Sequence, residues 1–376
     1  MTIKNILITG GAGFIGSKLS LKLIDKGYVV TVLDNLSLQI HAEYSPLYLS
    51  IKDKVKFIKG DVRNKADWFL ALDRQDVVVH LAAETGTGQS MYEIEKYVDV
   101  NIKGTAILLD ILTNTQHSIK KLVIASSRSI YGEGKYHCKS CGTVYPDERK
   151  DNDMKRGDFQ VKCPFCRANA ELLPTDEESK IHPSSLYGIT KQNQEQMVLT
   201  IGKSIGIPAV AFRYQNVYGP GQSLSNPYTG ILSIFSTRIK NGNDITVFED
   251  GLESRDFVYI DDVVDATILG IEKDEAAYEV FNVGFGERTN VLTVAEALKK
   301  EYSSHVNIIV SGNYRLGDIR DNYADLTKIK GKLGFTPKVD FENGIKRFAQ
   351  WVNNQEIMMD NYDGSIEEMK LKGLFK

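Results

Sequence analysis

The segment that most constrains the fold is ILITGGAGFIG, residues 6–16, in which a β-branched run leads directly into regularly spaced glycines. Gly10 permits a tight turn, Gly13 allows the backbone to approach a pyrophosphate, and Gly16 lets the following helix pack closely on the strand. The amino end of that helix offers unpaired amides and partial positive charge to phosphates. A glycine triplet alone is weak evidence, but this one lies between a strand pattern and a helix pattern and so predicts a dinucleotide-binding turn. We therefore expect the cofactor to be bordered by Gly10, Gly13, Phe14, Ile15 and Gly16.

The first half of the chain alternates apolar runs with amphipathic helical stretches. The helical stretches include 14–26, 98–115 and a segment that begins near Ser184. The apolar runs are nearly continuous, as expected for strands that are covered on both faces. Strands are expected at 5–10, 28–34, 55–61, 76–82, 121–127 and 207–214. This alternation predicts an α/β fold with a Rossmann-type, doubly wound parallel sheet.

The alternation loosens beyond about residue 218, which divides the chain into unequal parts. We expect a cofactor-binding domain over 1–218, with a zinc-ribbon-like insert at 134–174. Residues 219–354 are expected to form a smaller, mixed substrate-binding domain, from which some segments return to the first sheet. Residues 355–376 form a tail whose pattern indicates a surface helix with a packing role.

Composition excludes several classes of partner. A net charge of −3 provides no basic surface, which disfavours nucleic acids and anionic membranes as partners. No apolar run approaches the roughly 20 residues that a membrane-spanning helix needs. The first residues lack the apolar core and cleavage site of a signal peptide. We therefore expect the reducing cytoplasm, where paired cysteines bind metal more often than they form disulfides.

A carboxylate at the end of the second predicted strand bears on the choice of cofactor. Asp34 and Asn35 close the run VVTVLDN. A carboxylate at this place can accept hydrogen bonds from both ribose hydroxyls and repels a 2′-phosphate, which favours NAD over NADP. The alternative, that Asp34 only caps the loop, is less favoured once the glycines are considered.

A serine, a tyrosine and a lysine suggest acid–base chemistry. Tyr187 and Lys191 in SSLYGITK lie four residues apart and hence on one face of a helix. A phenol has an unperturbed pKa near ~10 and is a poor base at neutral pH. An adjacent ammonium, helped by the positive nicotinamide of an oxidised cofactor, favours the phenolate, and we expect a lowered pKa at Tyr187. Ser127, at the carboxyl end of the fifth predicted strand, can hydrogen-bond a substrate hydroxyl.

Taken together, these motifs resemble the extended short-chain dehydrogenases/reductases, in particular the NAD-dependent nucleotide-sugar epimerases and dehydratases. The resemblance rests on TGGAGFIG, LDN, GDVRN, HLAAETGTGQS, NIKGT, SSRSIYG, YGITK, FRYQNVYGPG, SRDFVYIDDV and YRLGDIRDNYAD. It covers the chain except for the cysteine-bearing insert and the extreme C-terminus. The resemblance implies tightly bound NAD, a nucleoside-diphosphate sugar as substrate, and a homodimer formed through helices near 98–115 and 184–204.

Further site residues follow from the same resemblance. Asp61 and Val62 match positions that flank the adenine, and Tyr214 matches one near the nicotinamide ring. Further positions implied on the cofactor side are Leu81, Ala82, Ala83 and Asn101. The positions implied in substrate binding are Glu84, Thr85, Ser127, Arg128, Asn216, Arg255, Arg315 and Asp318. A guanidinium fork suits phosphate oxygens, although each arginine taken singly is more often an ordinary surface ion-pair former.

The resemblance implies a common first step, oxidation at sugar C4. Dehydratases of this family carry an Asp-Glu pair in the loop after the fifth strand, whereas this chain has Ser127, Arg128, Ser129 and Ile130 there. Elimination is therefore disfavoured and 4-epimerisation favoured. SSRxxYGEG, HLAAETGxGQSMYE and a cysteine-bearing insert most resemble the dTDP-L-rhamnose 4-epimerase-like enzymes, which form dTDP-6-deoxy-L-talose; a UDP-hexose is a second possible substrate. A dehydratase, a decarboxylase of the same family and a non-catalytic NAD-binding scaffold stay open as alternatives.

The four cysteines form two Cys-x-x-Cys pairs. Cys138 and Cys141 precede Cys163 and Cys166, with 21 residues between the pairs. This spacing is typical of a zinc ribbon, and four thiolates fill a tetrahedral shell, so we expect a structural rather than a catalytic zinc. A redox switch or buried free thiols are the less favoured alternatives. Because the insert leaves just after Ser127 and returns just before Tyr187, it is expected to form a wall or lid of the sugar pocket, a subunit contact, or a solvent-facing decoration.

Overall fold

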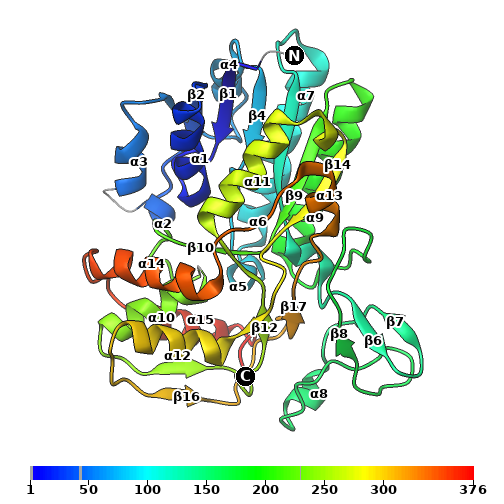
Figure 1. Ribbon diagram of the computed structural model, residues 1–376, viewed down its shortest axis with the longest axis vertical. Coiled ribbons are helices and arrows are strands. Elements are labelled where there is room, and N and C mark those ends of the chain that lie inside the picture. Colours follow the sequence, from blue (N-terminus) through cyan, green and yellow to red (C-terminus); the bar gives the residue numbers. More distant parts are fainter. Residues whose placement is uncertain (1–2, 42–44, 229) are drawn as a thin grey trace.

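The computed structural model describes residues 3–41, 45–228 and 230–376. Its centre is a seven-stranded sheet in which every neighbouring pair is parallel (Figure 1). The order across the sheet is β14-β9-β5-β4-β1-β2-β3. The strands are β1 (Asn5–Thr9), β2 (Val29–Asp34), β3 (Lys56–Lys59), β4 (Val77–His80), β5 (Lys121–Ser127), β9 (Ala209–Tyr214) and β14 (Glu279–Val283). The predicted Rossmann-type sheet is confirmed.

Helices cover both faces of this sheet and form two apolar cores. On one face, α1 (Phe14–Asp25) and α11 (Ile260–Glu272) pack beside each other on inward-facing residues such as Ile6 and Val32. On the other face, α4 (Lys65–Leu72), α7 (Gly104–Asn114) and α9 (Leu186–Ser204) enclose the residues around Trp68. Burial on both faces explains why the sequence shows continuous rather than alternating apolar runs.

One predicted helix is not regular. The stretch 98–115 was expected to be a single helix, but it consists of the π-helix η1 (Val98–Lys103) followed by α7, and α6 (Ile94–Tyr97) precedes it. The π-helix contains Asn101, which is buried and hydrogen-bonded outside its own helix. Such wide turns frequently mark functional sites, because they redirect a side chain.

A smaller part of the molecule lies beyond the carboxyl ends of the central strands (Figure 1). Its helices are α10 (Ile231–Lys240), α12 (Val291–Glu301), α14 (Phe341–Asn353) and α15 (Tyr362–Leu371). Its short strands are β10 (Asn216–Tyr218), β11 (Ile245–Val247), β12 (Ser254–Arg255), β13 (Phe257–Tyr259), β15 (Thr289–Asn290), β16 (Ile308–Val310) and β17 (Asp321–Asn322). β14 and α13 (Thr327–Leu333) pack together and return the chain to the central sheet.

The insert that holds the cysteines forms its own three-stranded antiparallel sheet beside β17 (Figure 1). Its elements are β6 (Tyr136–Cys138), β7 (Gly142–Val144), α8 (Asp151–Met154) and β8 (Glu171–Leu172). Gly142 directly follows the first cysteine pair with a φ of +75°, as such a turn requires.

The remaining elements are short. They are α2 (Leu38–His41), α3 (Pro46–Ile51), α5 (Thr87–Ser90), η2 (Arg128–Tyr131) and η3 (Asp274–Ala276). In the described ranges, no helix is both long and apolar enough to cross a bilayer.

Candidate active site

A cavity of about 980 Å³ opens at the carboxyl ends of the central strands. We call it the nucleotide cavity. It is lined by eighteen of the residues that the sequence indicated: Gly10, Gly13, Phe14, Ile15, Gly16, Asp34, Asn35, Asp61, Val62, Leu81, Ala82, Ala83, Glu84, Thr85, Ser127, Tyr187, Lys191 and Tyr214. Residues at the carboxyl ends of β2, β5 and β9, residues that follow β1 and β4, and residues of α9 thus meet in one hollow, as expected where ligands bind in open α/β sheets.

The glycine turn between β1 and α1 leaves space for a ligand rather than for side chains. Gly10 has a φ of +66°, and its amide donates to the carbonyl of Leu33 at 2.9 Å, which ties the turn to β2. A side chain at Gly16 would collide with the backbone of Gly10. Gly13 is the N-cap of α1 and has no side chain to occupy the amides of the first turn. The turn therefore presents bare amides at a helix N-terminus, which suits a phosphate.

Asp34 anchors the opposite end of the turn. One carboxylate oxygen accepts from the Ala12 amide at 3.0 Å, and the other accepts from the Leu36 amide at 2.9 Å. His41 Nε2 lies 3.4 Å from the second oxygen, and both side chains are buried. His41 lines the cavity, and no motif in the sequence pointed to it.

Asp61 lies on the same side of the nucleotide cavity. Arg63 holds it with Nε and Nη2 at 2.9 and 2.8 Å, and Asn35 donates to it at 3.1 Å. The hydrogen bond from Arg63 lowers the pKa of Asp61 to about 2, which outweighs the effect of partial burial. Asp61 therefore stays an acceptor of hydrogen bonds throughout the ordinary pH range.

The loop after β4 is fixed from behind by Asn101. This side chain accepts from the Glu84 amide at 2.8 Å and donates to the Glu84 carbonyl at 3.1 Å and to Thr190 Oγ1 at 3.0 Å. Asn101 was predicted on the cofactor side, but the structure places it fully buried and outside the cavity lining. It connects the loop that carries Glu84 to the helix that carries Tyr187.

Helix α9 presents the tyrosine and the lysine to the nucleotide cavity. Ser185 caps α9 by accepting from the Gly188 amide at 3.1 Å, and Ser90 accepts from the Tyr187 amide at 3.0 Å. Lys191 Nζ donates to Gln194 at 2.7 Å. Burial lowers the pKa of Lys191 to about 7, although Glu195 opposes this shift.

The environment of Tyr187 differs from the expectation. Burial raises the pKa of Tyr187, whereas hydrogen bonding with Ser127 and the charge of Arg128 lower it without reversing the shift. The lowering predicted from Lys191 and the nicotinamide of oxidised NAD together stays a prediction, since the protein groups alone leave the pKa of Tyr187 raised: burial disfavours the phenolate more than Ser127 and Arg128 favour it. The cation that favours the phenolate is Arg128.

The carboxyl end of β5 is held by a buried ion pair. Arg213 binds Glu195 through Nη2 at 2.6 Å and Nε at 3.1 Å, and Ser126 donates to the same carboxylate at 2.5 Å. Ser127 then begins η2, and its oxygen accepts from Ser129. β5, β9 and α9 are thereby locked together next to Ser127 and Tyr187.

Five predicted substrate residues gather outside the cavity lining, in what we call the arginine cluster. Its members are Arg128, Asn216, Arg255, Arg315 and Asp318. Arg128 Nε donates to Asn216 at 2.8 Å, while Asp318 pairs with Arg255 at 3.2 Å and with Arg315 at 2.9 Å. Burial disfavours the charged form of Asp318, yet Arg315, Arg255, Arg149 and Arg128 hold its pKa down at about 2.

The arginine cluster carries three cations against one carboxylate, and its charge is therefore suited to an anion. Within the described part of the chain, Arg315 Nε is a buried donor with no partner. Burial, followed by repulsion from Arg255, lowers the pKa of Arg128 to about 9. A bound diphosphate would relieve this repulsion by accepting from several guanidinium groups.

The four cysteines converge in the insert. Their sulfur atoms all lie within 4.8 Å of one another, and the Cys138 and Cys166 sulfurs are 3.5 Å apart. Cys138 and Cys163 are buried, while Cys141 and Cys166 are exposed. Neighbouring ligands of a tetrahedral zinc with bonds of about 2.3 Å are separated by about 3.8 Å, so this donor set fits such an ion.

Gln215 is another residue that the sequence did not indicate. It is buried and lines the nucleotide cavity, and in the described residues neither atom of its amide has a partner. It directly follows Tyr214 at the carboxyl end of β9. The rule that ligands bind at this edge of the sheet could have identified it.

Comparison with known proteins agrees with this geometry. Residues 6–152 and 164–284 match the family described as "NAD dependent epimerase/dehydratase family". The chain is 35% identical to a dTDP-L-rhamnose 4-epimerase of Burkholderia thailandensis, over 93% of this chain and 95% of that protein.

Two solved structures extend the comparison. A UDP-glucose 4-epimerase of Thermotoga maritima, determined with UDP-glucose, is 32% identical with a TM-score of 0.76, covering 93% of this chain and 98% of that one. A UDP-glucuronic acid 4-epimerase of Bacillus cereus, determined with UDP-glucuronic acid and NAD, is 26% identical with a TM-score of 0.72, covering 93% and 99%.

Proposed function

Because the chain belongs to the NAD-dependent epimerase/dehydratase family, we propose that it inverts C4 of a nucleoside-diphosphate sugar through a transient 4-keto sugar. One observation carries this proposal: Tyr187 and Ser127 meet in the nucleotide cavity, with the cation of Arg128 acting on the tyrosine. The η2 turn, Arg128–Tyr131, contains no carboxylate that could assist the loss of water.

NAD fits the nucleotide cavity. The bare turn at Gly10–Gly16 suits its pyrophosphate, and the Asp34 carboxylate suits a ribose with both hydroxyls free. Asp61 and Val62 would hold the adenine end, and Ala82, Ala83 and Tyr214 the nicotinamide end. The unpartnered amide of Gln215 supplies a donor and an acceptor there. The chemistry that bound NAD supplies is the reversible acceptance of a hydride.

The side chains of this protein handle the proton and the orientation of the sugar. Tyr187 takes the proton of the C4 hydroxyl as general base, while Ser127 hydrogen-bonds the same oxygen. The Arg128 guanidinium favours the phenolate that must form for this step. Turning of the 4-keto sugar presents its other face for reduction, and Tyr187 then returns its proton to the C4 oxygen, which completes the new hydroxyl.

The arginine cluster would hold the diphosphate while the sugar turns. Three guanidinium groups around Asp318 can contact several phosphate oxygens without contacting the sugar ring. The substrate we favour is dTDP-L-rhamnose, with dTDP-6-deoxy-L-talose as product, because the dTDP-L-rhamnose 4-epimerase is similar over nearly the whole chain. A UDP-hexose is the second choice, from the similarity to UDP-sugar epimerases.

The test is incubation of the purified protein with dTDP-L-rhamnose, UDP-glucose and UDP-glucuronic acid, followed by nuclear magnetic resonance of the products. We expect a C4 epimer from at least one of them, with no added reductant. A persistent 4-keto-6-deoxy sugar would instead identify a dehydratase, and loss of carbon dioxide would identify a decarboxylase. Binding of NAD without turnover of any sugar nucleotide would favour the non-catalytic scaffold.

We also propose that the four-cysteine cluster binds one structural zinc ion. Four thiolates leave no open coordination position, so this ion would order the insert and take no part in sugar chemistry. Reduced thiols of this kind belong in a reducing compartment, which supports a place in the cytoplasm. Metal analysis of the purified protein should give about one zinc per chain.

A homodimer is supported by apolar side chains exposed on neighbouring helices. Ile94 on α6, Val98 on η1 and Ile189 on α9 are 55%, 37% and 43% exposed. These three elements pack beside one another. Light scattering should give twice the chain mass for the parent and the chain mass for an Ile94→Glu/Ile189→Glu variant.

A further inference from the structure

The chain between the two cysteine pairs contacts the arginine cluster directly, through Arg149 and Asp318. We call residues 142–162 the docking segment; it leaves the four-cysteine cluster after Cys141 and returns to it at Cys163. Both of its ends are thus held at one point. Residues 314–318 lie opposite the docking segment. We call them the substrate loop, because they include Arg315 and Asp318.

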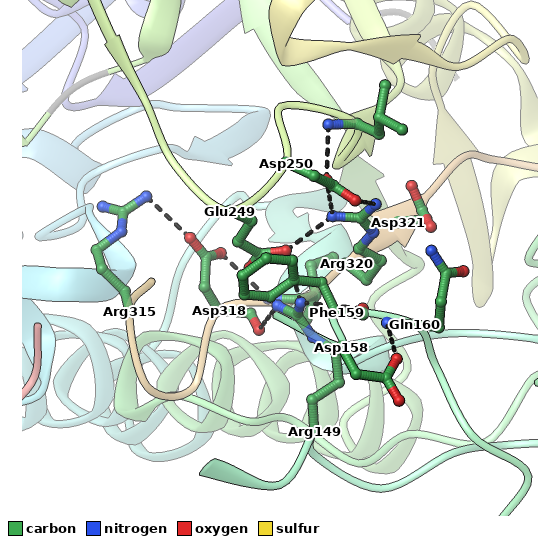
Figure 2. A network of polar contacts seen from close by, with 12 residues as sticks. Arg149, Asp158, Phe159, Gln160, Glu249, Asp250, Arg315, Asp318, Arg320 and Asp321 are labelled. Atoms are coloured by element: carbon green, nitrogen blue, oxygen red, sulfur yellow. Dashed lines mark hydrogen bonds and ion pairs between the residues drawn. The ribbon is translucent and has the colours of Figure 1, made fainter. Parts of the chain in front are cut away.

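Arg149 of the docking segment reaches the substrate loop directly. Its Nη2 donates to the carbonyl oxygen of Asp318 at 2.9 Å, and its Nη1 donates to Glu249 at 2.7 Å. Its Nε donates to Glu133 at 3.2 Å. Only 4% of the Arg149 side chain is exposed, so the guanidinium is committed to these contacts (Figure 2).

Arg320, just beyond the substrate loop, is held by the same carboxylates. Its amide donates to Glu133 at 2.8 Å, and its Nη1 donates to Glu249 at 2.8 Å and to Asp250 at 2.7 Å. Glu249 therefore joins the guanidinium groups of Arg149 and Arg320 (Figure 2). Glu133 joins the Arg149 guanidinium to the Arg320 amide. Buried charges arranged in this way tolerate little displacement, because each loses its partner when another moves.

Tyr314 supplies a second contact with the docking segment. Its hydroxyl donates to Asp151 at 2.6 Å, and its ring lies 6.3 Å from that of Phe159. Met154, Phe159 and Tyr314 form a small apolar core with Leu316 packed against it. The C-terminus joins the same point, because Lys376 Nζ lies 2.9 Å from Asp151.

The other side of the substrate loop faces the catalytic helix. Ser184 Oγ donates to the Gly317 carbonyl at 3.1 Å, three residues before Tyr187. The backbone of Leu316 pairs with that of Leu374 at 3.0 Å. The loop between Tyr314 and Asp318 thus has the docking segment on one side and the entry to α9 on another.

We propose that the docking segment positions the substrate loop for binding the diphosphate of the nucleotide sugar, with Arg149 as the main positioning residue. The inference rests on the proposed function, since it concerns the same substrate. Arg149 does not reach the substrate in this account; it fixes the Asp318 carbonyl and so fixes the Asp318 carboxylate that orients Arg255 and Arg315. The insert is then a support of the substrate site rather than a decoration facing solvent.

The test uses Arg149→Lys in the full-length protein loaded with NAD. Lysine keeps a cation for Glu133 and Glu249 but cannot reproduce the fork that also reaches the Asp318 carbonyl. We expect the dissociation constants of dTDP and UDP, measured by calorimetry, to rise by about tenfold, with NAD content unchanged. In turnover, KM for the sugar nucleotide should rise by a similar factor, while kcat stays within about twofold.

The matched control is Arg156→Lys. Arg156 lies in the same segment but is 70% exposed and pairs with Asp153, so nucleotide affinity should not change. Tyr314→Phe keeps the ring and removes only the bond to Asp151, and it should weaken nucleotide binding by a few-fold even if Arg149→Lys fails to fold.

Two outcomes would separate failure of the inference from failure of the proposed function. If Arg149→Lys and Tyr314→Phe lower the melting temperature but bind dTDP and UDP as the parent does, the segment is only structural and the inference is wrong. If the parent itself binds neither nucleotide, the proposed function fails, and the inference falls with it.

Discussion

The nucleotide cavity and the arginine cluster are the two halves of the site that we propose, but the chain builds them in different ways. The cavity is formed where regular strands end, and its essential turn depends on missing side chains at Gly10, Gly13 and Gly16. The arginine cluster is formed by irregular segments, and its geometry depends on ion pairs between residues far apart in the sequence, such as Arg255 and Asp318.

Because of this difference, a substitution in one half of the site should weaken binding there and leave binding in the other half unchanged. A repeating sheet fixes the cavity through backbone hydrogen bonds and burial, which single surface changes hardly disturb. A buried charge network fixes the arginine cluster, and the loss of one partner leaves another charge uncompensated.

The largest effect, on kcat, is expected at Tyr187, where the nucleotide cavity and the arginine cluster meet. Tyr187→Phe removes the general base and should lower kcat by about 10³-fold. NAD content and nucleotide affinity should stay unchanged, because the variant removes only the hydroxyl and keeps the ring that lines the nucleotide cavity. Tyr302→Phe, which removes a hydroxyl bonded only to Ser236, is the control and should leave turnover unaffected. Turnover by Tyr187→Phe close to that of the parent would remove the proposed chemistry.

A change confined to the nucleotide cavity comes next. Gly13 has a φ of −75°, which any residue adopts, and an added Cβ would meet the Gly10 carbonyl oxygen at 3.2 Å. Gly13→Val should therefore fold with a small shift of the turn but fill the space into which a pyrophosphate fits. We expect NAD affinity to fall by about a hundredfold, equivalent to about 2.7 kcal/mol. Gly331→Ala, at a glycine with open space around it, is the matched control. A similar loss of dTDP affinity in the absence of NAD would contradict the separation of the two halves.

A change confined to the insert tests the other half. Cys163→Ser removes one buried sulfur from the four-cysteine cluster and should abolish binding of the zinc ion that we propose there. Because the docking segment then loses its anchor, the dissociation constant for dTDP should rise by about tenfold, with NAD content preserved. Elemental analysis and calorimetry on the same preparation check both parts. Unchanged dTDP affinity after complete loss of metal would show that the anchor is unnecessary.

The smallest predicted effect is a shift in the pH dependence of kcat. It tests whether Arg128, in the arginine cluster, acts on Tyr187 in the nucleotide cavity. Arg128 favours the phenolate of Tyr187, so Arg128→Met should raise the tyrosine pKa further. Since turnover requires the deprotonated tyrosine, the rising limb of kcat against pH should move to higher pH by about one unit. The profile is measured at saturating substrate, so that weaker substrate binding by this variant does not alter it. Arg156→Met should leave the profile unchanged, and an acid shift for Arg128→Met would reverse the assigned role.

The same contrast explains what the sequence could predict. The turn around Gly10 and the ends of β2, β4, β5 and β9 follow from local patterns of glycine and β-branched residues, so their cavity-lining residues could be named. The cysteine spacing likewise predicted that four sulfurs converge. The boundaries of the parts of the chain and the roles of single site residues stay predictions.

Other features depended on contacts that no local pattern encodes. Arg149 lies 100 positions from Glu249 and 169 from Asp318, and nothing beside it in the sequence marks it as buried. His41 is brought to Asp34 by the short helix α2. The pKa of Tyr187 was expected to fall, because a sequence shows neighbouring charges more readily than the loss of water around them.

The central claim is that hydride leaves C4 of the sugar and returns to the same carbon. The most direct measurement uses dTDP-L-rhamnose carrying deuterium at C4, with the products followed by nuclear magnetic resonance in ordinary water. The account predicts a C4 epimer that retains the deuterium at C4. Replacement of that deuterium by solvent hydrogen, or its appearance at another carbon, would contradict it.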